Sequence, residues 1–327
     1  MKAWQVTQHG EPEEVLALAD IPRPEPGPGQ ILVRVLAAAA NFPDVLLCRG
    51  TYQVKMPLPF TLGVELCGEV IEAGPGVTGF AAGDRVIGDT ALPHGAFAEY
   101  ALMDAPAALP APAALDDAEA APFYVTYETC WVGLHRRARL RDGETLLVHA
   151  AAGGVGTGAI QLGKAAGAQV IGVVGGPEKM ALAKEVGADV VIDRSEEDFV
   201  AVVKEVTRGK GADVVFDPVG GDVFRKSTKC IAFEGRILVV GFASGDIPSA
   251  ALNHALVKNY DILGLQARTY RFVANEATKE HYAALLRLTE TGAIKTVVTE
   301  RLALGDVPDG LRRLAAGMTT GRIVFIP

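Results

Sequence analysis

The chain has 327 residues, which corresponds to about two domains at roughly 150 residues each and excludes a small peptide scaffold. Apolar residues make up 49% and charged residues 21%, which is the composition of a globular protein. Lys and Arg number 31 and Asp and Glu number 39, and the resulting net charge of −8 argues against binding to nucleic acid or to an anionic membrane surface.

Short apolar runs separated by Gly and Pro fill the chain before about residue 122. This spacing is typical of a β-rich region, and it predicts strands at residues 2–7, 31–40, 65–73, 84–88 and 96–102. Residues 21–30 contain too many prolines for a helix or a central strand, so we expect an extended surface connection there.

From residue 144 the pattern changes to alternating strands and helices. Strands are predicted at 144–150, 169–174, 189–192, 212–217, 236–240 and 260–265, and helices at 154–166, 177–186, 198–207 and 222–230. Continuous apolar strands that alternate with helices form buried parallel sheets, so this region predicts a doubly wound α/β domain.

After residue 268 the sequence predicts a long helix at 272–291, a short strand at 296–299, a helix at 307–316 and a final strand at 322–326. These elements are too few to bury a core of their own. We therefore predict one domain at residues 1–123 that residues 268–327 rejoin, and a second domain at residues 124–267.

A glycine-rich loop follows the first strand of the second domain. Residues 151–156 read AAGGVG, with Gly153 and Gly156 at the second and third positions of G-x-G-x-x-G and Ala151 at the first. A turn of this kind lets a pyrophosphate reach backbone N–H groups at a helix N-terminus, so we expect Ala151, Gly153, Gly154, Val155 and Gly156 to bind a dinucleotide. The alternative is a loop that only packs tightly.

The next strand bears on which dinucleotide is bound. A carboxylate about 20 residues after the loop would bind the ribose 2′-hydroxyl of NAD, but the strand ends at Val174 without an acid. Gly175, Lys179 and Arg194 follow in positions where the two cations would neutralise a 2′-phosphate. The sequence therefore favours NADPH, although Lys179 also fits the description of a solvent-exposed helix charge.

The cysteines bear on the compartment. Cys48, Cys67, Cys130 and Cys230 lie tens of residues apart without a C-x-x-C pair, which is typical neither of a zinc ribbon nor of a disulfide framework. No stretch reaches the roughly 18 uncharged apolar residues of a membrane-spanning helix, and the first ten residues lack the apolar core of a signal peptide. We expect a cytoplasmic protein that does not bind membranes.

Several motifs together resemble a known family. They are AAGGVG at 151–156, NFPD at 41–44, GVELCGEV at 63–70, FDPVGG at 216–221 and the ending TTGRIVFIP at 319–327. The chain resembles the medium-chain dehydrogenase/reductase superfamily and, within it, the quinone oxidoreductase (zeta-crystallin-like) family. The resemblance implies a GroES-like β-rich catalytic domain interrupted by a Rossmann domain, which matches the order of elements above.

The resemblance also points to departures from the zinc-dependent members of that superfamily. A catalytic zinc usually has three protein ligands, yet Asn41 stands where Cys is usual and Val64 where His is usual. Residues 89–102 contain no Cys, so the four-cysteine structural lobe is missing as well. We therefore expect no metal.

Without a metal, hydrogen bonds must stabilise the oxygen that gains negative charge during hydride transfer. Asn41, Asp44 and Tyr52 match polar pocket positions of the family, and they are our candidate catalytic residues. Tyr52 would donate a hydrogen bond or a proton, and Asn41 would hold the nicotinamide ribose or the substrate oxygen. The structural alternatives are a helix N-terminal charge for Asp44 and a packed loop residue for Tyr52.

The resemblance places further coenzyme contacts after two later strands. Val219 lies in FDPVGG, and Phe242 and Ala243 follow the strand at 236–240, where backbone contacts to the nicotinamide ring are expected. The strand at 260–265 is apolar and belongs at the sheet edge, where pairing with a second subunit would remove an exposed edge. We expect a homodimer formed through this edge.

The function that fits best is a zinc-independent, NADPH-dependent reductase of a small electrophile, either a quinone or a related α,β-unsaturated carbonyl compound. A reductase of enoyl thioesters is the alternative, because a cluster of arginines is available for a nucleotide-bearing substrate: Arg136, Arg137, Arg139 and Arg141. A helix end also attracts cations for its own dipole. The alternative from another class is a non-catalytic NADPH-binding or RNA-associated protein.

Overall fold

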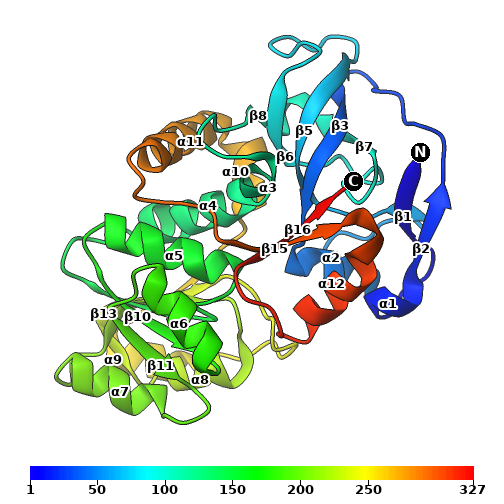
Figure 1. The fold of residues 1–327 in the computed structure, drawn as a ribbon. Helices are drawn as coiled ribbons and strands as arrows, with labels where there is room; N and C mark the ends of the chain where they lie inside the picture. The colour runs from blue at the N-terminus through cyan, green and yellow to red at the C-terminus, as the bar shows by residue number, and fades with distance from the viewer. The chain divides into compact units, whose positions relative to one another are not determined.

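Two units make up the chain (Figure 1): residues Met1–Val125 join Thr296–Pro327 in the first, and Thr126–Lys295 form the second. The structure is a computed structural model that describes the backbone of residues 1–327 and every side chain except those of Arg271, Phe272 and Asn275. Within the part of the chain that it describes, no helix is both long and apolar enough to cross a membrane.

The first unit is mostly β. A three-stranded sheet has the order β2-β1-β4, and a seven-stranded sheet has the order β15-β16-β3-β5-β6-β8 with β7 paired to β3. Its strands are β1 (Lys2–Val6), β2 (Leu16–Asp20), β3 (Gln30–Ala39), β4 (Phe60–Thr61), β5 (Glu65–Ala73), β6 (Arg85–Asp89), β7 (Tyr100–Asp104), β8 (Ala108–Pro110), β15 (Val298–Ala303) and β16 (Arg322–Ile326). Its helices are α1 (Pro12–Val15), α2 (Phe42–Cys48), α3 (Asp117–Ala120) and α12 (Val307–Ala315).

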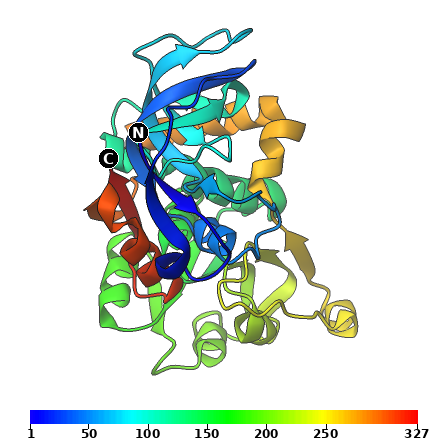
Figure 2. The same ribbon diagram turned by 90° about the vertical axis from the view of Figure 1, so that its right-hand side faces the viewer.

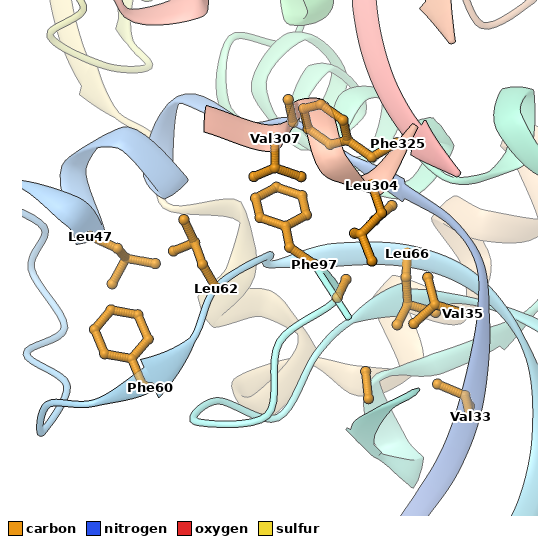
Figure 3. Close-up of a cluster of buried hydrophobic side chains, with 14 of the residues drawn as sticks. Val33, Val35, Leu47, Phe60, Leu62, Leu66, Phe97, Leu304, Val307 and Phe325 are labelled. Atoms are coloured by element: carbon orange, nitrogen blue, oxygen red, sulfur yellow. The ribbon is translucent and has the colours of Figure 1, made fainter. Parts of the chain in front are cut away.

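Both ends of the chain contribute to the core of this unit. Phe97 packs edge-to-face on Phe325 of β16 with ring centroids 5.2 Å apart, and Val307 of α12 lies in the same buried cluster (Figure 3). Helix α12 also packs against α1 and α2, so the N-terminal and C-terminal segments lie side by side, as the blue and red ribbons of Figure 2 show. Residues 296–327 thus belong to the same compact unit as residues 1–125, whereas the sequence analysis expected the return of the chain from residue 268.

The second unit contains a six-stranded parallel sheet in the order β11-β10-β9-β12-β13-β14. Its strands are β9 (Thr145–His149), β10 (Gln169–Val174), β11 (Val190–Asp193), β12 (Ala212–Asp217), β13 (Ile231–Val239) and β14 (Asp261–Gly264). Its helices are α5 (Gly154–Ala165), α6 (Pro177–Glu185), α7 (Phe199–Val206), α8 (Gly221–Ser227), α9 (Leu252–Lys258), α10 (Ala267–Val273) and α11 (Asn275–Glu290), and α4 (Phe123–Trp131) carries the chain in from the first unit.

Helices cover both faces of this sheet. Gly163 of α5 packs directly on Leu146 of β9. The alternate strand residue Leu147 belongs to a core cluster with Phe199 of α7 and Phe224 of α8. Because successive strand residues point to opposite faces, α5 covers one face and α7 and α8 the other. The predicted doubly wound sheet inserted into a β-rich domain is therefore confirmed.

The predicted boundary at residue 268 is wrong, because the return to the first unit begins at Thr296. His281 of α11 bonds the buried Glu128 of α4 at 3.2 Å, and the Gln161 side chain of α5 exchanges two hydrogen bonds with the backbone of Lys295. These contacts keep α11 in the second unit. The sequence pattern also missed α9, and the helix predicted from residue 272 is divided into α10 and α11.

Candidate functional site

The predicted nucleotide-binding residues lie in the loops that follow β9, β10, β11, β12 and β13. The strands of this sheet run parallel, so the loops share the carboxyl edge of the sheet. Ligands of open α/β sheets bind at this edge. The fold thus brings together residues that are separated by almost one hundred positions in the sequence.

The glycine loop makes a tight turn from β9 into α5. Ala150 has φ of 50°, and the N–H of Gly153 donates to the carbonyl oxygen of Ala150 at 2.9 Å. A Cβ on Gly156 would lie 2.2 Å from that oxygen, so only glycine fits where the helix passes the turn. The first-turn N–H groups, which include those of Gly154 and Val155, have no acceptor inside the helix. The loop therefore fits a pyrophosphate group.

Ala151, at the first glycine position, has a different role from that of its neighbours. It is fully buried and donates its N–H to Val173 of β10 at 3.1 Å. Its methyl group also packs against Gly172, where a Cβ would approach it to 3.0 Å. Ala151 thus anchors the loop to the next strand.

Two cations lie beside the turn that follows β10. The Arg194 guanidinium covers Gly175, because a Cβ there would lie 3.2 Å from Arg194 Nε. Lys179 is in the first turn of α6, and burial followed by the nearby Arg194 charge lowers the pKa of its ammonium group. Two like charges held close together favour an anion between them. This arrangement fits the predicted 2′-phosphate site.

The loops after β12 and β13 are joined to each other. Ala243 N–H donates to Pro218 O at 3.0 Å, and the Phe242 ring covers Gly220, where a Cβ would approach it to 2.8 Å. Asp217 Oδ1 accepts the N–H groups of Val219 and Gly220 at 2.8 and 2.9 Å. The structure therefore brings together Val219, Phe242 and Ala243, the three residues expected to contact the coenzyme. The Ala243 N–H is already engaged within the loops.

The candidate catalytic residues of the first unit belong to a buried hydrogen-bond network. Asn41 is the N-cap of α2, and its Nδ2 donates to Glu65 Oε2 at 3.0 Å and to Ala39 O at 3.2 Å. Arg322 Nη2 donates to Asn41 Oδ1 at 2.8 Å and to Glu65 Oε2 at 2.9 Å. Both amide protons of Asn41 are thus donated to groups of the protein itself.

Asp44 supports the same region from the first turn of α2. It is fully buried, and its two oxygens accept the N–H of Asn41 at 2.8 Å and the N–H of Val64 at 3.1 Å. Glu65 is also fully buried, and its Oε1 accepts the N–H of Val125 at 2.6 Å. Both carboxyl groups therefore position backbone segments around the Asn41 side chain.

Burial is the largest influence on the pKa values of the two carboxyl groups in this network, Asp44 and Glu65. It raises the pKa of Asp44 and of Glu65 to about 7, and the Arg322 charge and the hydrogen bonds to both groups offset only part of that shift. Asp89 adds to the negative charge near Glu65. One guanidinium cannot neutralise two desolvated carboxylates, so the network retains a proton near neutral pH.

Tyr52 lies in the loop that follows α2. Its N–H donates to Leu46 O at 3.2 Å, and its half-buried ring packs against the core cluster that contains Phe60 and Leu62. Asn41, Asp44 and Tyr52 are therefore all carried by α2 and its flanks.

Comparison with known proteins identifies the family. Residues 27–113 match the alcohol dehydrogenase GroES-like domain family, and residues 154–289 match the zinc-binding dehydrogenase family. A quinone oxidoreductase of Pseudomonas aeruginosa is 38% identical over 328 residues, covering 100% of this chain and 99% of that protein. The chain belongs to the quinone oxidoreductase family of the medium-chain dehydrogenases/reductases.

Other members of the quinone oxidoreductase family support this assignment. A quinone oxidoreductase-like protein 2 homolog of Nematostella vectensis is 37% identical over 301 residues, which is 91% of this chain and 82% of that protein. The crystal structure of Escherichia coli quinone oxidoreductase complexed with NADPH has a TM-score of 0.93 and 33% identity, with both chains covered completely. Membership in this family makes the chain a reductase of the medium-chain class.

Glu65 and Arg322 are site residues that the sequence analysis missed. They lie 257 positions apart in the chain, so no local spacing connects them. The available signal was a charged residue at the start of an apolar strand, which holds for both β5 and β16. Buried charges are seldom unpaired, so two such residues in one domain are candidates for a pair.

Arg136 and Arg137 of the arginine cluster have side-chain partners within the second unit, and Arg139 is held by its backbone carbonyl. The guanidinium of Arg136 lies 5.3 Å from the ring centroid of Tyr270, Arg137 Nε donates to Gly264 O at 3.2 Å, and Arg236 Nη2 donates to the carbonyl oxygen of Arg139. His149, before the glycine loop, is a buried residue that bonds Ser227 Oγ at 2.9 Å. These contacts give Arg136, Arg137 and His149 structural roles within the second unit.

Proposed function

We propose that this protein is an NADPH-dependent, zinc-independent reductase of quinones or related α,β-unsaturated carbonyl compounds. The observation that carries the coenzyme choice is the pair of cations, Lys179 and Arg194, beside the turn Gly175–Gly176. A relative with an NADPH complex and the same fold supports this choice. The residues that would hold NADPH are the glycine loop, these two cations and the joined loops that contain Val219, Phe242 and Ala243.

Bound NADPH would supply the hydride, and the candidate catalytic residues would orient the substrate and supply the proton. Both Nδ2 protons of Asn41 are engaged and its Oδ1 already accepts one hydrogen bond from Arg322, so the second lone pair of Oδ1 is what this side chain offers to a coenzyme or substrate group. An oxygen accepts hydrogen bonds, which favours a ribose hydroxyl as the partner over a substrate oxygen. The Tyr52 hydroxyl is then our candidate donor to the oxygen that gains charge.

Zinc independence is supported by what occupies the expected ligand positions. Asn41 is held by Glu65 and Arg322, and Val64 has no donor atom in its side chain. Among the described residues, no group of three or more His, Cys, Asp and Glu side chains is placed to hold a metal ion. A catalytic zinc needs such a set.

The test is a substrate panel with the purified protein. NADPH oxidation is followed with 1,4-benzoquinone, an enone, an enal and an enoyl thioester, before and after prolonged treatment with a chelator. We expect turnover with the first three substrates, a preference of at least about tenfold for NADPH over NADH, and no effect of the chelator. Turnover of the thioester alone would favour the alternative reductase. Stoichiometric zinc whose removal abolishes activity would contradict the metal-free mechanism.

We further propose a cytoplasmic homodimer that pairs through the second unit. Helix α9 has no buried residue, and Leu252, Leu256 and Val257 on it are more than 70% exposed. The strand that follows, β14, is at the edge of the six-stranded sheet. An apolar surface next to an unpaired strand edge is a natural interface for a second copy. All four cysteines are buried thiols that are not joined in disulfides, which is compatible with a reducing compartment.

A further inference from the structure

The turn that holds the two cations is itself held by a carboxylate at the end of the neighbouring strand. In the sheet register, Val174 at the end of β10 lies opposite Asp193 at the end of β11. Each strand is followed by one side of the cation site, Gly175–Gly176 after β10 and Arg194 after β11. Asp193 is therefore at the point where both segments begin.

The Asp193 carboxylate joins these two segments by hydrogen bonds. It accepts the Gly176 N–H with both oxygens at 3.1 Å. Its Oδ1 also accepts the Ser195 N–H at 3.0 Å and the Ser195 hydroxyl at 2.5 Å. The residue is only 7% exposed, and the Ser195 and Gly176 hydrogen bonds hold the pKa of its carboxyl below the usual range. The Asp193 carboxylate is thus charged and buried, and its oxygens already accept hydrogen bonds from the protein.

Gly176 shows why the turn needs this support. It has φ of 89° and ψ of 161°, a conformation open to glycine, and it is the N-cap of α6 without a side chain of its own to cap the helix. The carboxylate that accepts its N–H determines the position of the first turn of α6, which carries Lys179. Through Ser195, the same carboxylate determines the path of the chain next to Arg194.

The negative charge of the Asp193 carboxylate bears on which coenzyme this turn can bind. A free carboxylate at this edge would accept a ribose 2′-hydroxyl and repel a 2′-phosphate. The two oxygens of Asp193 instead receive donors from Gly176 and Ser195, which use most of their acceptor capacity. Resting on the proposed NADPH dependence, we propose that Asp193 and Ser195 form a clip that positions Gly176, Lys179 and Arg194 for a 2′-phosphate and thereby determines coenzyme specificity.

Nucleotide fragments test the clip without turnover. Binding of adenosine 2′,5′-bisphosphate and of 5′-AMP is measured by calorimetry on the full-length protein. Ser195→Ala removes the hydroxyl donor, and we expect it to weaken the bisphosphate about tenfold while 5′-AMP changes less than about twofold. Asp193→Asn loses the charge and one acceptor, and we expect a larger loss in the same direction. In turnover, KM for NADPH rises and kcat is unchanged.

Asp198 supplies the matched control, because it is also a carboxylate that caps a helix in the same segment, accepting the Val200 N–H at the start of α7. Asp198→Asn should leave the ratio of the two affinities unchanged. Tighter bisphosphate binding in Asp193→Asn, or equal losses for both nucleotides in Ser195→Ala, would overturn the clip. Equal binding of both nucleotides by the wild-type protein would instead overturn the NADPH proposal and the clip together.

Discussion

Glu65 and Arg322 form a buried ion pair, with Arg322 Nη2 2.9 Å from Glu65 Oε2, that joins the start of β5 to the start of β16. The Glu65 side chain is fully buried and that of Arg322 is 7% exposed. The same guanidinium bonds Asn41, so the ion pair also determines the orientation of that amide. The C-terminal strand is therefore part of the candidate catalytic site as well as of the core.

The first prediction concerns this ion pair. Arg322→Met removes the cation that bonds Glu65 and leaves the buried carboxyl group without it, so the free energy of unfolding should fall by about 3 to 5 kcal/mol. Urea denaturation followed by circular dichroism measures the change. Arg301→Met is the control, because Arg301 pairs with Asp116 on the surface, where both side chains are about half exposed. Its loss should cost less than about 1 kcal/mol.

The second prediction is a pH dependence with a definite sign. Asp44 and Glu65 have ordinary pKa values of 3.8 and 4.5, and burial raises both to about 7 in the folded chain. The folded state thus binds protons more tightly, and this contribution to stability is full below about pH 4 and is lost as the pH rises toward 7. Two other charged groups act on the pKa of Glu65: the Arg322 charge lowers it and the Asp89 charge raises it.

Unfolding by urea at pH 5.0, 6.0, 7.0 and 8.0 checks this sign. We expect the wild-type free energy of unfolding to decrease across the first three values and to decrease less steeply in Glu65→Gln, which cannot take up the proton. A slope identical in the wild type and in the variant would show that Glu65 does not titrate in this range.

The sequence predicted the strands of the sheet in the second unit and helices α5 to α8. Its strands are continuous apolar runs separated by helices with clear ends, so β10 and β12 were predicted with their exact bounds. Helix α9 was missed because its apolar residues face outward, and a pattern that assumes a buried face does not detect it. The boundary at Thr296 was missed because it depends on contacts of α11 with Glu128 and Gln161.

The site was predictable where its chemistry is local in sequence. The glycine loop, Lys179 and Arg194 each follow a strand, and parallel strands bring their ends together. The partners of Asn41 could not be derived in this way, because Glu65 and Arg322 come from distant strands. The Asp193 contacts with Gly176 and Ser195 likewise depend on the register of β10 and β11, which sequence alone leaves open.

The third prediction separates the two coenzymes. Arg194→Ala and Lys179→Ala each remove one cation from the proposed 2′-phosphate site, and each should weaken NADPH binding about tenfold while NADH binding changes little. Fluorescence titration of both coenzymes provides the measurement. Lys184→Ala is the control, because Lys184 is an exposed residue in the last turn of the same helix. Equal losses for NADPH and NADH would place both cations elsewhere than at the 2′-phosphate.

The fourth prediction concerns assembly. Leu252→Asp combined with Leu256→Asp places charges on α9, where the two leucines are 76% and 77% exposed and do not support the fold of the monomer. We expect a dimer mass for the wild type and a monomer mass for the variant by size exclusion with light scattering. Leu18→Asp on the exposed strand β2 of the first unit should remain dimeric. A dimer in all three proteins would move the interface away from α9.

The last prediction concerns the proton donor. Tyr52→Phe keeps the ring that packs on the Phe60 cluster and removes only the hydroxyl, so the fold should be preserved. If this hydroxyl stabilises an oxygen that gains charge, its loss acts on the transition state, and turnover should fall by roughly 10-fold to 1,000-fold with unchanged NADPH affinity. The loss should be larger for an enone than for a quinone, because quinones are stronger electrophiles and need less assistance.

Steady-state kinetics with both substrate classes make this test, and Tyr100→Phe serves as the control. Tyr100 lies on β7 with the Arg23 guanidinium 5.7 Å from its ring centroid, and the proposed reaction assigns no role to its hydroxyl. If Tyr52→Phe turns over both substrates as fast as the control does, Tyr52 is a packed loop residue. In that case the proton must come from water or from a ribose hydroxyl, since both Nδ2 protons of Asn41 are already donated to Ala39 and Glu65.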